Sequence, residues 1–265
     1  MSIAKGKIYY INTEYKLSGT NSRFTYQIQI PQNSGFDHVC VLQASIPLSF
    51  YLVQNGTNTF TLTELGIPAI ITIPEGNYNY QTFMTAITAL LNTNSPHGWV
   101  YSITFSLLTA KYIFKVTGNS GQPTLSFTSH ISQQFGFNKV SNNTFIGNTL
   151  TSINTVNFIP ESTIYIHSDI VEDDTDILQE IYSNNTIPYS QVTYQLKTSV
   201  DAYSKKLRTT KANSFSFYLT NEEDDELLVN GQDVLITLLL YKKDDFTDTF
   251  RKYISWSVQK SENDG

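Results

Sequence analysis

Residues 36–94 decide the fold of this chain. Within them a dense apolar run ending ASIPLSFY (44–51) passes through QNGTNTF (54–60) and ITIPEGNY (71–78) into a single helix pattern. Prolines and glycines separate the apolar runs. Proline has no backbone N–H for a sheet ladder, and glycine accepts positive φ. The stretch therefore predicts short strands with sharp breaks, followed by one helix.

The strands of this stretch are predicted from its apolar runs. Residues 39–46 are typical of a strand that is buried on both faces, and Pro47 interrupts its ladder. Phe50–Val53 is expected to resume the strand. Asn55-Gly56 then turns the chain toward a further strand at 59–62.

A helix is predicted directly after a short strand at 70–73. Pro74 and Gly76 end that strand, and Asn77 or Asn79 is placed to cap the helix. Apolar residues then recur at three- and four-residue spacing: Tyr80, Phe83, Met84, Ile87, Leu90 and Leu91. Because the opposite face is uncharged, the stripe is expected to cover a sheet rather than to bind a membrane or a cofactor.

The rest of the chain is dominated by strand patterns. Residues 24–30 alternate most cleanly between apolar and polar side chains. Further strands are expected at 99–105, 112–116, 125–127, 163–168, 192–196, 215–219 and 234–241, with a short helix or turn at 176–182. About eleven or twelve strands and one strong helix favour a mainly β fold built as an antiparallel sandwich.

Composition supports the β assignment and limits the possible partners. The 265 residues are 40% hydrophobic, 13% aromatic and 15% charged, with a formal net charge of -6. Thr, Asn, Ser and Tyr supply much of the polarity, which suits pleated surfaces and turns. An acidic chain does not neutralise phosphate broadly, so strong nucleic-acid binding is not expected. The length fits one large β domain or two modest ones.

The termini and the basic residues indicate neither export nor DNA binding. The start, MSIAKGKIYY, lacks the apolar core of a signal peptide, and no segment has the ~20 apolar residues needed to span a bilayer. A soluble product made in a cytosol is expected. The one basic cluster, Lys205, Lys206, Arg208 and Lys211, is expected to be a solvated face or an edge-strand guard rather than a phosphate site.

No pattern of reactive residues points to an enzyme, a cofactor or a metal. Cys40 lies inside VCVLQ and is expected to be a buried filler. The four histidines, His38, His97, His130 and His167, are scattered singly, and no nucleophile-elbow or phosphate-loop motif occurs. His167 alternates with Tyr165 on one strand face, where a surface or hydrogen-bonded structural role is favoured.

Two acidic clusters need a separate interpretation. Residues 172–176 and 222–226 are rich in Asp and Glu, which can bind hard cations, but neither has EF-hand spacing. Solvated loops explain both better, and a divalent ion that bridges subunits is the alternative. Paired carboxylates for glycoside hydrolysis stay open because partners could come from distant strands.

The order of the motifs resembles the penton proteins of virophages and polinton-like viruses. The resemblance covers most of the chain, and it is carried by VCVLQASIPLSFYLV (39–53), GTNTFTL (56–62), ITIPEGNYNY (71–80), FGF (135–137), IYIHSDI (164–170), FSFYL (215–219) and LLVNGQDVLITLLLY (227–241). The resemblance rests on the common order of these motifs, with strands expected on either side of them. Pro47, Gly76 and Gly231 correspond to turn-forming motif residues, so no catalytic role is implied for them.

The resemblance implies a jelly-roll sandwich with a small α+β insertion that carries the helix. Residues 1–59 and 138–265 would form the jelly roll, and residues 60–137 are the candidate insertion module. It also implies a structural role without catalysis: a homopentamer at the icosahedral vertices of a double-stranded DNA virus, located in the virion and assembled in the host cell. Its partners would be copies of itself and trimers of a double jelly-roll major capsid protein. A host receptor is left open as a further partner.

Two departures and one alternative accompany the resemblance. The chain has no long basic N-terminal arm and no Arg-Gly-Asp triplet, so neither DNA tethering nor integrin binding is supported. The alternative is another jelly-roll capsid or spike component that binds host glycans or a receptor. Trp99 or Trp256 could then form an aromatic platform, although a core position is favoured for both.

Overall fold

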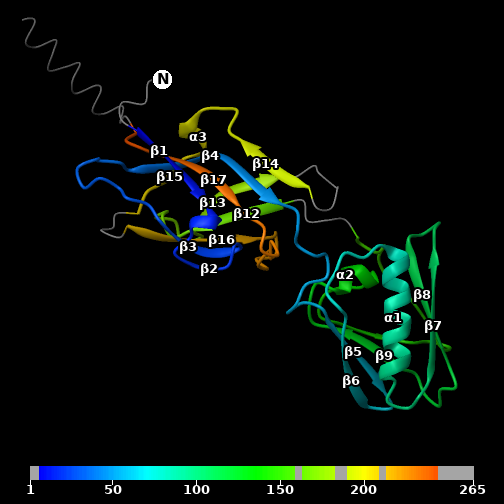
Figure 1. Ribbon diagram of the computed structural model, residues 1–265. Coiled ribbons are helices and arrows are strands. Elements are labelled where there is room, and N and C mark those ends of the chain that lie inside the picture. Colours follow the sequence, from blue (N-terminus) through cyan, green and yellow to red (C-terminus); the bar gives the residue numbers. More distant parts are fainter. Residues whose placement is uncertain (1–5, 159–162, 183–189, 209–212, 244–265) are drawn as a thin grey trace, which may run out of the picture. The chain divides into compact units, whose positions relative to one another are not determined.

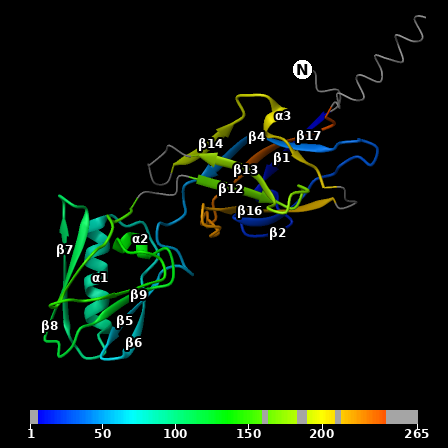
Figure 2. The ribbon, with the colours of Figure 1, turned by 180° about the vertical axis from the view of Figure 1, so that it is seen from behind.

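The computed structural model of the chain describes residues 6–158, 163–182, 190–208 and 213–243. The chain divides into two units, which we call the sandwich unit (residues 1–49 and 161–265) and the inserted unit (residues 50–160). Strands dominate both units (Figure 1 and Figure 2). The mainly β fold expected from the sequence is therefore confirmed.

Two antiparallel sheets build the sandwich unit. The first sheet has the order β1 (Gly6–Asn12), β17 (Leu235–Tyr241), β4 (His38–Pro47) and β14 (Gln191–Gln195), and β15 (Lys205–Lys206) also pairs with β4. The second has the order β13 (Ile177–Tyr182), β12 (Thr163–Ser168), β16 (Ser214–Thr220), β3 (Arg23–Gln27) and β2 (Ser18–Gly19). The 3-10 turn η1 (Thr13–Tyr15) and the short helix α3 (Val200–Tyr203) complete the unit.

The strand pairing is that of a jelly roll. Among the described strands of the unit, with the two-residue strands β2 and β15 set aside, the first pairs with the last, as β1 with β17. The second pairs with the seventh (β3 with β16), the third with the sixth (β4 with β14), and the fourth with the fifth (β12 with β13). One long hairpin wrapped into two sheets gives this nested pairing, which defines the jelly-roll architecture.

Alternation along the strands places the core between the two sheets. On β16, Phe215, Phe217 and Leu219 are buried, whereas Ser216 between them is exposed. Phe24 of β3 stacks on Phe217 with their ring centroids 5.5 Å apart. Burying a side chain of this size contributes about 1.5–3 kcal/mol. The period-two pattern therefore fixes which face of each strand points inward.

The prediction of a helix or turn at 176–182 is wrong, because the segment forms strand β13. β13 pairs with β12 along its length, with a bulge between Ile166 and His167. Ile177 and Ile181 are β-branched residues, which fit a pleated surface. Hydrogen bonding to a neighbouring strand, which is invisible in the local sequence, decides the conformation.

The inserted unit lies in the connection between β4 and β12 and consists of two small sheets and a helix. One sheet has the order β10 (Ser141–Thr144), β9 (Thr124–Phe127), β5 (Thr59–Glu64) and β6 (Ile67–Thr72), and the other has the order β11 (Thr149–Thr151), β8 (Lys111–Thr117) and β7 (Val100–Ser106). The helices are α1 (Tyr80–Asn94) and the single turn α2 (Ser132–Phe135). The unit covers residues 50–160, a longer segment than the module expected at 60–137, and Phe145 is part of its core.

The helix α1 begins and packs as its sequence predicts. The side chain of Asn79 accepts hydrogen bonds from the backbone N–H groups of Gln81 and Thr82, and Thr82 completes a capping box. Such a cap stabilises a helix by about 1 kcal/mol. Phe83, Ile87 and Leu91 are buried in one apolar cluster with side chains from both small sheets.

We predict that Phe83→Ala destabilises the inserted unit by about 3–5 kcal/mol, because the aromatic ring would leave a cavity. Phe83 is fully buried and its ring contacts those of Tyr78, Tyr112, Phe135 and Phe158. Urea unfolding with limited proteolysis would locate the loss in residues 50–160. Met84→Ala is the matched control on the same helix, because Met84 is only partly buried, and an equal loss in both variants would contradict the prediction.

Candidate functional site

The side chains that chemistry would use are dispersed over the described residues. Within ranges 6–158, 163–182, 190–208 and 213–243, no group of three or more His, Cys, Asp or Glu side chains is arranged to hold a metal ion. No helix in these ranges is long and apolar enough to cross a membrane. One polar arrangement, in which both ring nitrogens of a histidine have partners, is centred on His167, on the second sheet of the sandwich unit.

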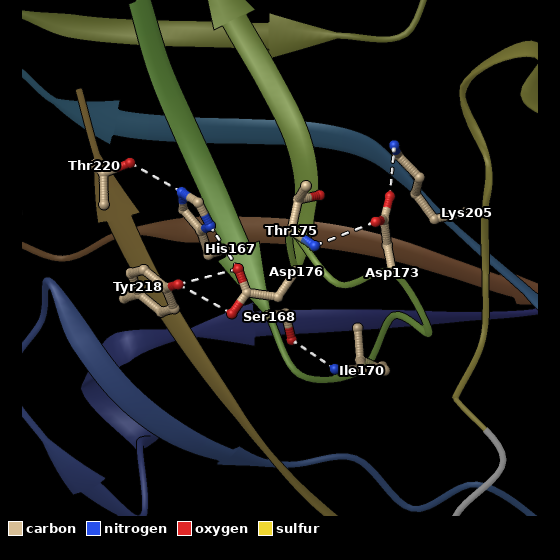
Figure 3. Close-up of polar contacts among 9 residues, drawn as sticks. All are labelled: His167, Ser168, Ile170, Asp173, Thr175, Asp176, Lys205, Tyr218 and Thr220. Atoms are coloured by element: carbon tan, nitrogen blue, oxygen red, sulfur yellow. Dashed lines mark hydrogen bonds and ion pairs between the residues drawn. The ribbon is translucent and has the colours of Figure 1, made fainter. Parts of the chain in front are cut away.

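The His167 ring is held between two strands and a turn. Its Nδ1 lies 2.8 Å from Oδ1 of Asp176, and its Nε2 lies 2.9 Å from Oγ1 of Thr220 on β16. The Tyr218 hydroxyl donates to the same carboxylate, at 3.0 and 2.9 Å from its two oxygens. Figure 3 shows the ring enclosed by these partners. In the neutral imidazole that carries its proton on Nδ1, this N–H donates to the Asp176 carboxylate. The Nε2 atom then accepts a hydrogen bond from the Thr220 hydroxyl.

Local backbone geometry creates this arrangement. The bulge after Ile166 shifts the register between β12 and β13, and Asp176 just before β13 has a positive φ of 47°. Asp tolerates this left-handed conformation better than most residues. The bulge and the turn together bring the Asp176 carboxylate to the His167 ring, although the two residues lie on different segments.

A column of stacked planar groups extends the cluster across the outer face of the sheet. The His167 and Tyr218 rings stack with centroids 4.4 Å apart and planes 9° apart. The Arg23 guanidinium lies 4.1 Å from the Tyr218 centroid, and its Nε donates to Glu226 at 2.7 Å. Cation–π contacts at such sites are worth about 0.5–1 kcal/mol. The column therefore ties β12, β16 and β3 together by their side chains.

The cluster has the connectivity of a hydrolytic triad, but its burial assigns it a structural role. The order Thr220, His167 and Asp176 matches hydroxyl, imidazole and carboxylate in serine-type hydrolases. Thr220 is only 1% exposed and His167 only 5%. A substrate carbonyl must approach the nucleophilic oxygen to react, and this hydroxyl is covered by the fold. The hydrogen-bonded structural role expected for His167 fits this geometry.

Electrostatics favours the protonated form of the tyrosine in this cluster. Burial, followed by the hydrogen bond to Asp176 and the charge of that carboxylate, raises the pKa of Tyr218 to about 12. Nearby, the pKa of Asp173 is lowered, first by the backbone N–H of Thr175 and then by contacts that include Lys205. The Asp173 carboxylate is thus stabilised in its charged form, while the Tyr218 phenol keeps its proton.

A buried carboxylate forms a second polar centre, in the inserted unit. Glu64 is fully buried and accepts hydrogen bonds from the Ser95 hydroxyl at 2.7 Å, the Tyr101 hydroxyl at 2.7 Å and the His97 backbone N–H at 2.8 Å. The His97 Nδ1 lies 3.3 Å from the same carboxylate. Burial and Glu64 raise the pKa of Tyr101. The network fixes the loop that follows α1, because every Glu64 oxygen has a donor.

The structure joins two charge clusters that the sequence separates. Lys206 pairs with Glu172 at 2.6 Å, and Lys205 lies 3.7 Å from Asp173. The basic cluster therefore faces the first acidic cluster, and such exposed pairs contribute at most about 1 kcal/mol each. Lys211 lies outside the described residues.

The three turn-motif residues lie at chain reversals or strand ends. Pro47 is the last residue of β4, opposite Gln191. Gly76 forms an isolated bridge with Val53. Asn230 and Gly231 have φ values of 48° and 79°, which a type I′ turn requires. These positions are compatible with the turn-forming role expected of the three residues.

Two further candidates are buried. Cys40 is 1% exposed, and burial, followed by the charge of Asp201, raises the pKa of its thiol to about 11. Trp99 is 5% exposed within the apolar cluster of the inserted unit. Cys40 is therefore a filler and Trp99 a core residue, as favoured from the sequence. Trp256 lies outside the described residues.

A pocket opens at the side of the sandwich unit. Its volume is about 610 Å³, and it is lined by β13, β14, α3 and neighbouring residues. β13 and β14 are edge strands of different sheets. Tyr182, Tyr194 and Tyr203 contribute rings to the lining, and Lys197 and Glu180 contribute charges. The sequence did not predict this pocket, because its walls come from segments of two different sheets that only the fold brings near each other.

We predict that the stability of the folded protein falls between pH about 10 and about 12, partly through Tyr218. An unfolded tyrosine has a pKa of about 10, whereas burial and Asp176 raise the pKa of Tyr218 to about 12. Between these values the folded state keeps a proton that the unfolded state has lost, so the stabilisation present below the lower pKa disappears as pH rises.

Urea midpoints measured at pH about 9 and about 11 would test this linkage. Tyr218→Phe cannot ionise, so its midpoint should fall less between the two pH values than that of the unaltered protein. Tyr15→Phe is the control, because Tyr15 is 67% exposed. The same pH dependence in the unaltered protein and in Tyr218→Phe would contradict the assignment.

Comparison with protein-family models finds no match to the chain. No curated protein matches its sequence. Among solved structures, the chain is similar to the mavirus penton protein, with a TM-score of 0.45 and 11% sequence identity over 89% of this chain and 100% of that chain.

Proposed function

We propose that the protein is a structural capsid subunit that forms the homopentameric penton at the vertices of an icosahedral double-stranded DNA virus. The nested pairing of the eight longer strands described in the sandwich unit carries this proposal, because jelly rolls are a common architecture of viral capsid subunits. The ordered motifs described above support the vertex position. In this role the protein assembles and performs no catalytic step.

The interior of the sandwich fits a structural role better than a ligand-holding one. Lectins and cupins also use jelly rolls. A metal or ligand held between the two sheets of the sandwich unit would need polar side chains at inward-facing positions. Phe217, Ile164 and Ile166 occupy such positions and are fully buried. They pack as a core, and this leaves the outer surfaces for recognition.

A ring of five copies needs two different complementary surfaces on each subunit. One candidate lies on the outer face of the first sheet, where Ile8 is 46%, Tyr10 74% and Leu235 46% exposed. Their paired positions put them on one face, and β1 is an edge strand of that sheet. Exposed apolar side chains beside an open strand edge are suited to contact with a neighbouring copy.

Light scattering after size-exclusion chromatography, together with negative-stain imaging, tests the proposal. We expect five-fold rings of the full chain, alone or on addition of the major capsid protein trimers proposed as partners. A regular dimer or trimer under assembly conditions would count against the proposed function.

We predict that Tyr10→Asp weakens pentamer formation, because a charge would be buried in the contact. A central contact residue of this kind is worth about 2 kcal/mol or more, roughly 30-fold in an equilibrium constant. Tyr15→Asp is the matched control, since Tyr15 is 67% exposed and lies in η1 outside the first sheet. If the unaltered protein, Tyr10→Asp and Tyr15→Asp associate equally well, the outer face of the first sheet is not part of the pentamer interface.

One observation favours a second candidate function, the binding of host glycans. The 610 Å³ pocket exposes tyrosine rings, of which Tyr182 is 71% and Tyr203 48% exposed. Aromatic rings can stack on the apolar face of a sugar. A glycan array would test this function, with Tyr203→Ala as the variant expected to lose any hit. An array without hits would exclude it.

A further inference from the structure

The hairpin that joins β7 and β8 has two leucines at its tip. Ser106 and Lys111 form the last pair of the hairpin, so the loop is 107–110. Leu107 is 79% exposed and Leu108 is 95% exposed. The loop is ordered by its own contacts, because the Thr109 N–H donates to Oγ of Ser106 at 3.3 Å. Two large apolar side chains are therefore presented to solvent on a fixed support.

A third exposed aliphatic residue belongs to a segment whose backbone is bonded to the base of this loop. The Lys111 ammonium donates to the carbonyl oxygen of Ile153 at 2.5 Å, and the Val156 N–H donates to the carbonyl oxygen of Ala110 at 2.9 Å. These bonds hold the segment 153–156 against the base of the loop. Ile153 is 55% exposed. The tip therefore combines three exposed aliphatic side chains with one lysine, and we call it the leucine tip (Leu107, Leu108, Lys111 and Ile153).

The unit that carries the leucine tip is nearly free of charge. From residue 50 to residue 160 the only Asp, Glu, Lys or Arg side chains are Glu64, Glu75, Lys111, Lys115 and Lys139. Glu64 is buried and hydrogen-bonded, so Glu75 is the one exposed acidic side chain of the described part of this unit. A surface of this kind does not repel anionic groups, whereas the chain as a whole has a formal net charge of -6.

The shape and size of the tip fit a lipid surface better than a protein partner. A stable protein contact uses about 20–30 residues on each side and needs a matching hollow for a protruding side chain. The described tip offers only a few apolar side chains. A membrane interface deforms around a protruding apolar group, and Lys111 beside it can contact anionic headgroups.

We propose that the leucine tip inserts into the headgroup region of a lipid membrane and attaches the protein to it peripherally. A single tip binds weakly, because two leucines bury little area. A ring presents every copy of the tip on the same side by symmetry, so clustering strengthens attachment. This last step rests on the proposed pentamer, whereas insertion of a single tip does not.

Co-sedimentation of the full chain with phosphatidylcholine vesicles, with and without phosphatidylserine, tests the proposal. The double variant Leu107→Ser/Leu108→Ser should lower the partition coefficient at least about tenfold, because apolar area is lost from the contact. Val100→Ser/Ile146→Ser is the matched control. Val100 is 58% and Ile146 83% exposed, and Val100 begins β7, at the end away from the tip.

A second variant keeps the tip apolar and gives a direct readout. Leu108→Trp should show a blue shift of its emission on addition of vesicles, and brominated lipid should quench it. Stronger binding in the presence of phosphatidylserine would support the role of Lys111.

Three outcomes would overturn the proposal: no vesicle binding by the unaltered protein, an equal loss in the control variant, or no blue shift in Leu108→Trp. Loss of self-association in the leucine variant, with unchanged vesicle binding, would assign the tip to a protein contact instead. Tip-dependent vesicle binding by a chain that stays monomeric even on addition of the major capsid protein trimers would sustain this inference and contradict the proposed pentamer.

Discussion

The pairing of β17 with both β1 and β4 is the constraint on which the rest of the sandwich unit depends. β17 is a central strand of the first sheet, and Leu238 and Leu240 are fully buried. A central strand satisfies its backbone groups on both sides, so both edges of β17 are occupied. Without it, β1 would have no partner strand, and β4 would keep only β14 and β15.

Polar contacts add specificity to this apolar framework. The His167 cluster connects β12, β16 and the turn before β13 through Asp176. It lies beside the bulge, where the ladder between β12 and β13 is irregular. Glu64 has an equivalent role in the inserted unit, because it fixes the loop after α1 through Ser95 and His97. In both units a buried ionisable group marks a place where regular backbone pairing ends.

Most of the secondary structure could be predicted from the sequence, because its pattern is local. The helix α1 followed from the spacing of Phe83, Ile87 and Leu91, and Asn79 is one of the two caps, Asn77 or Asn79, that the sequence offered. The alternation expected up to residue 30 continues as strand only to Gln27, and the strand expected at 50–53 is reduced to a bridge at Val53. Strand β1 was not predicted, since residues 6–12 show no clear alternation of apolar and polar side chains.

The candidate sites were much less predictable, because their partners are distant in sequence. His167 could be placed beside Tyr165, but Thr220 lies 53 residues away from it. The acidic and basic clusters were each interpreted as solvated, although Lys206 and Glu172 form an ion pair beside the isolated bridge between Val171 and Leu207. Tertiary pairing, which local periodicity does not contain, brings these groups together.

The nested strand order also determines when each unit can fold during synthesis on the ribosome. The inserted unit is complete once residue 160 has emerged, and its contacts are local in sequence. The first sheet lacks its central strand until Tyr241 has been made. Strand β1 therefore has no partner in the first sheet until residues 235–241 have been made, and a ring contact built on that sheet can form only after that point.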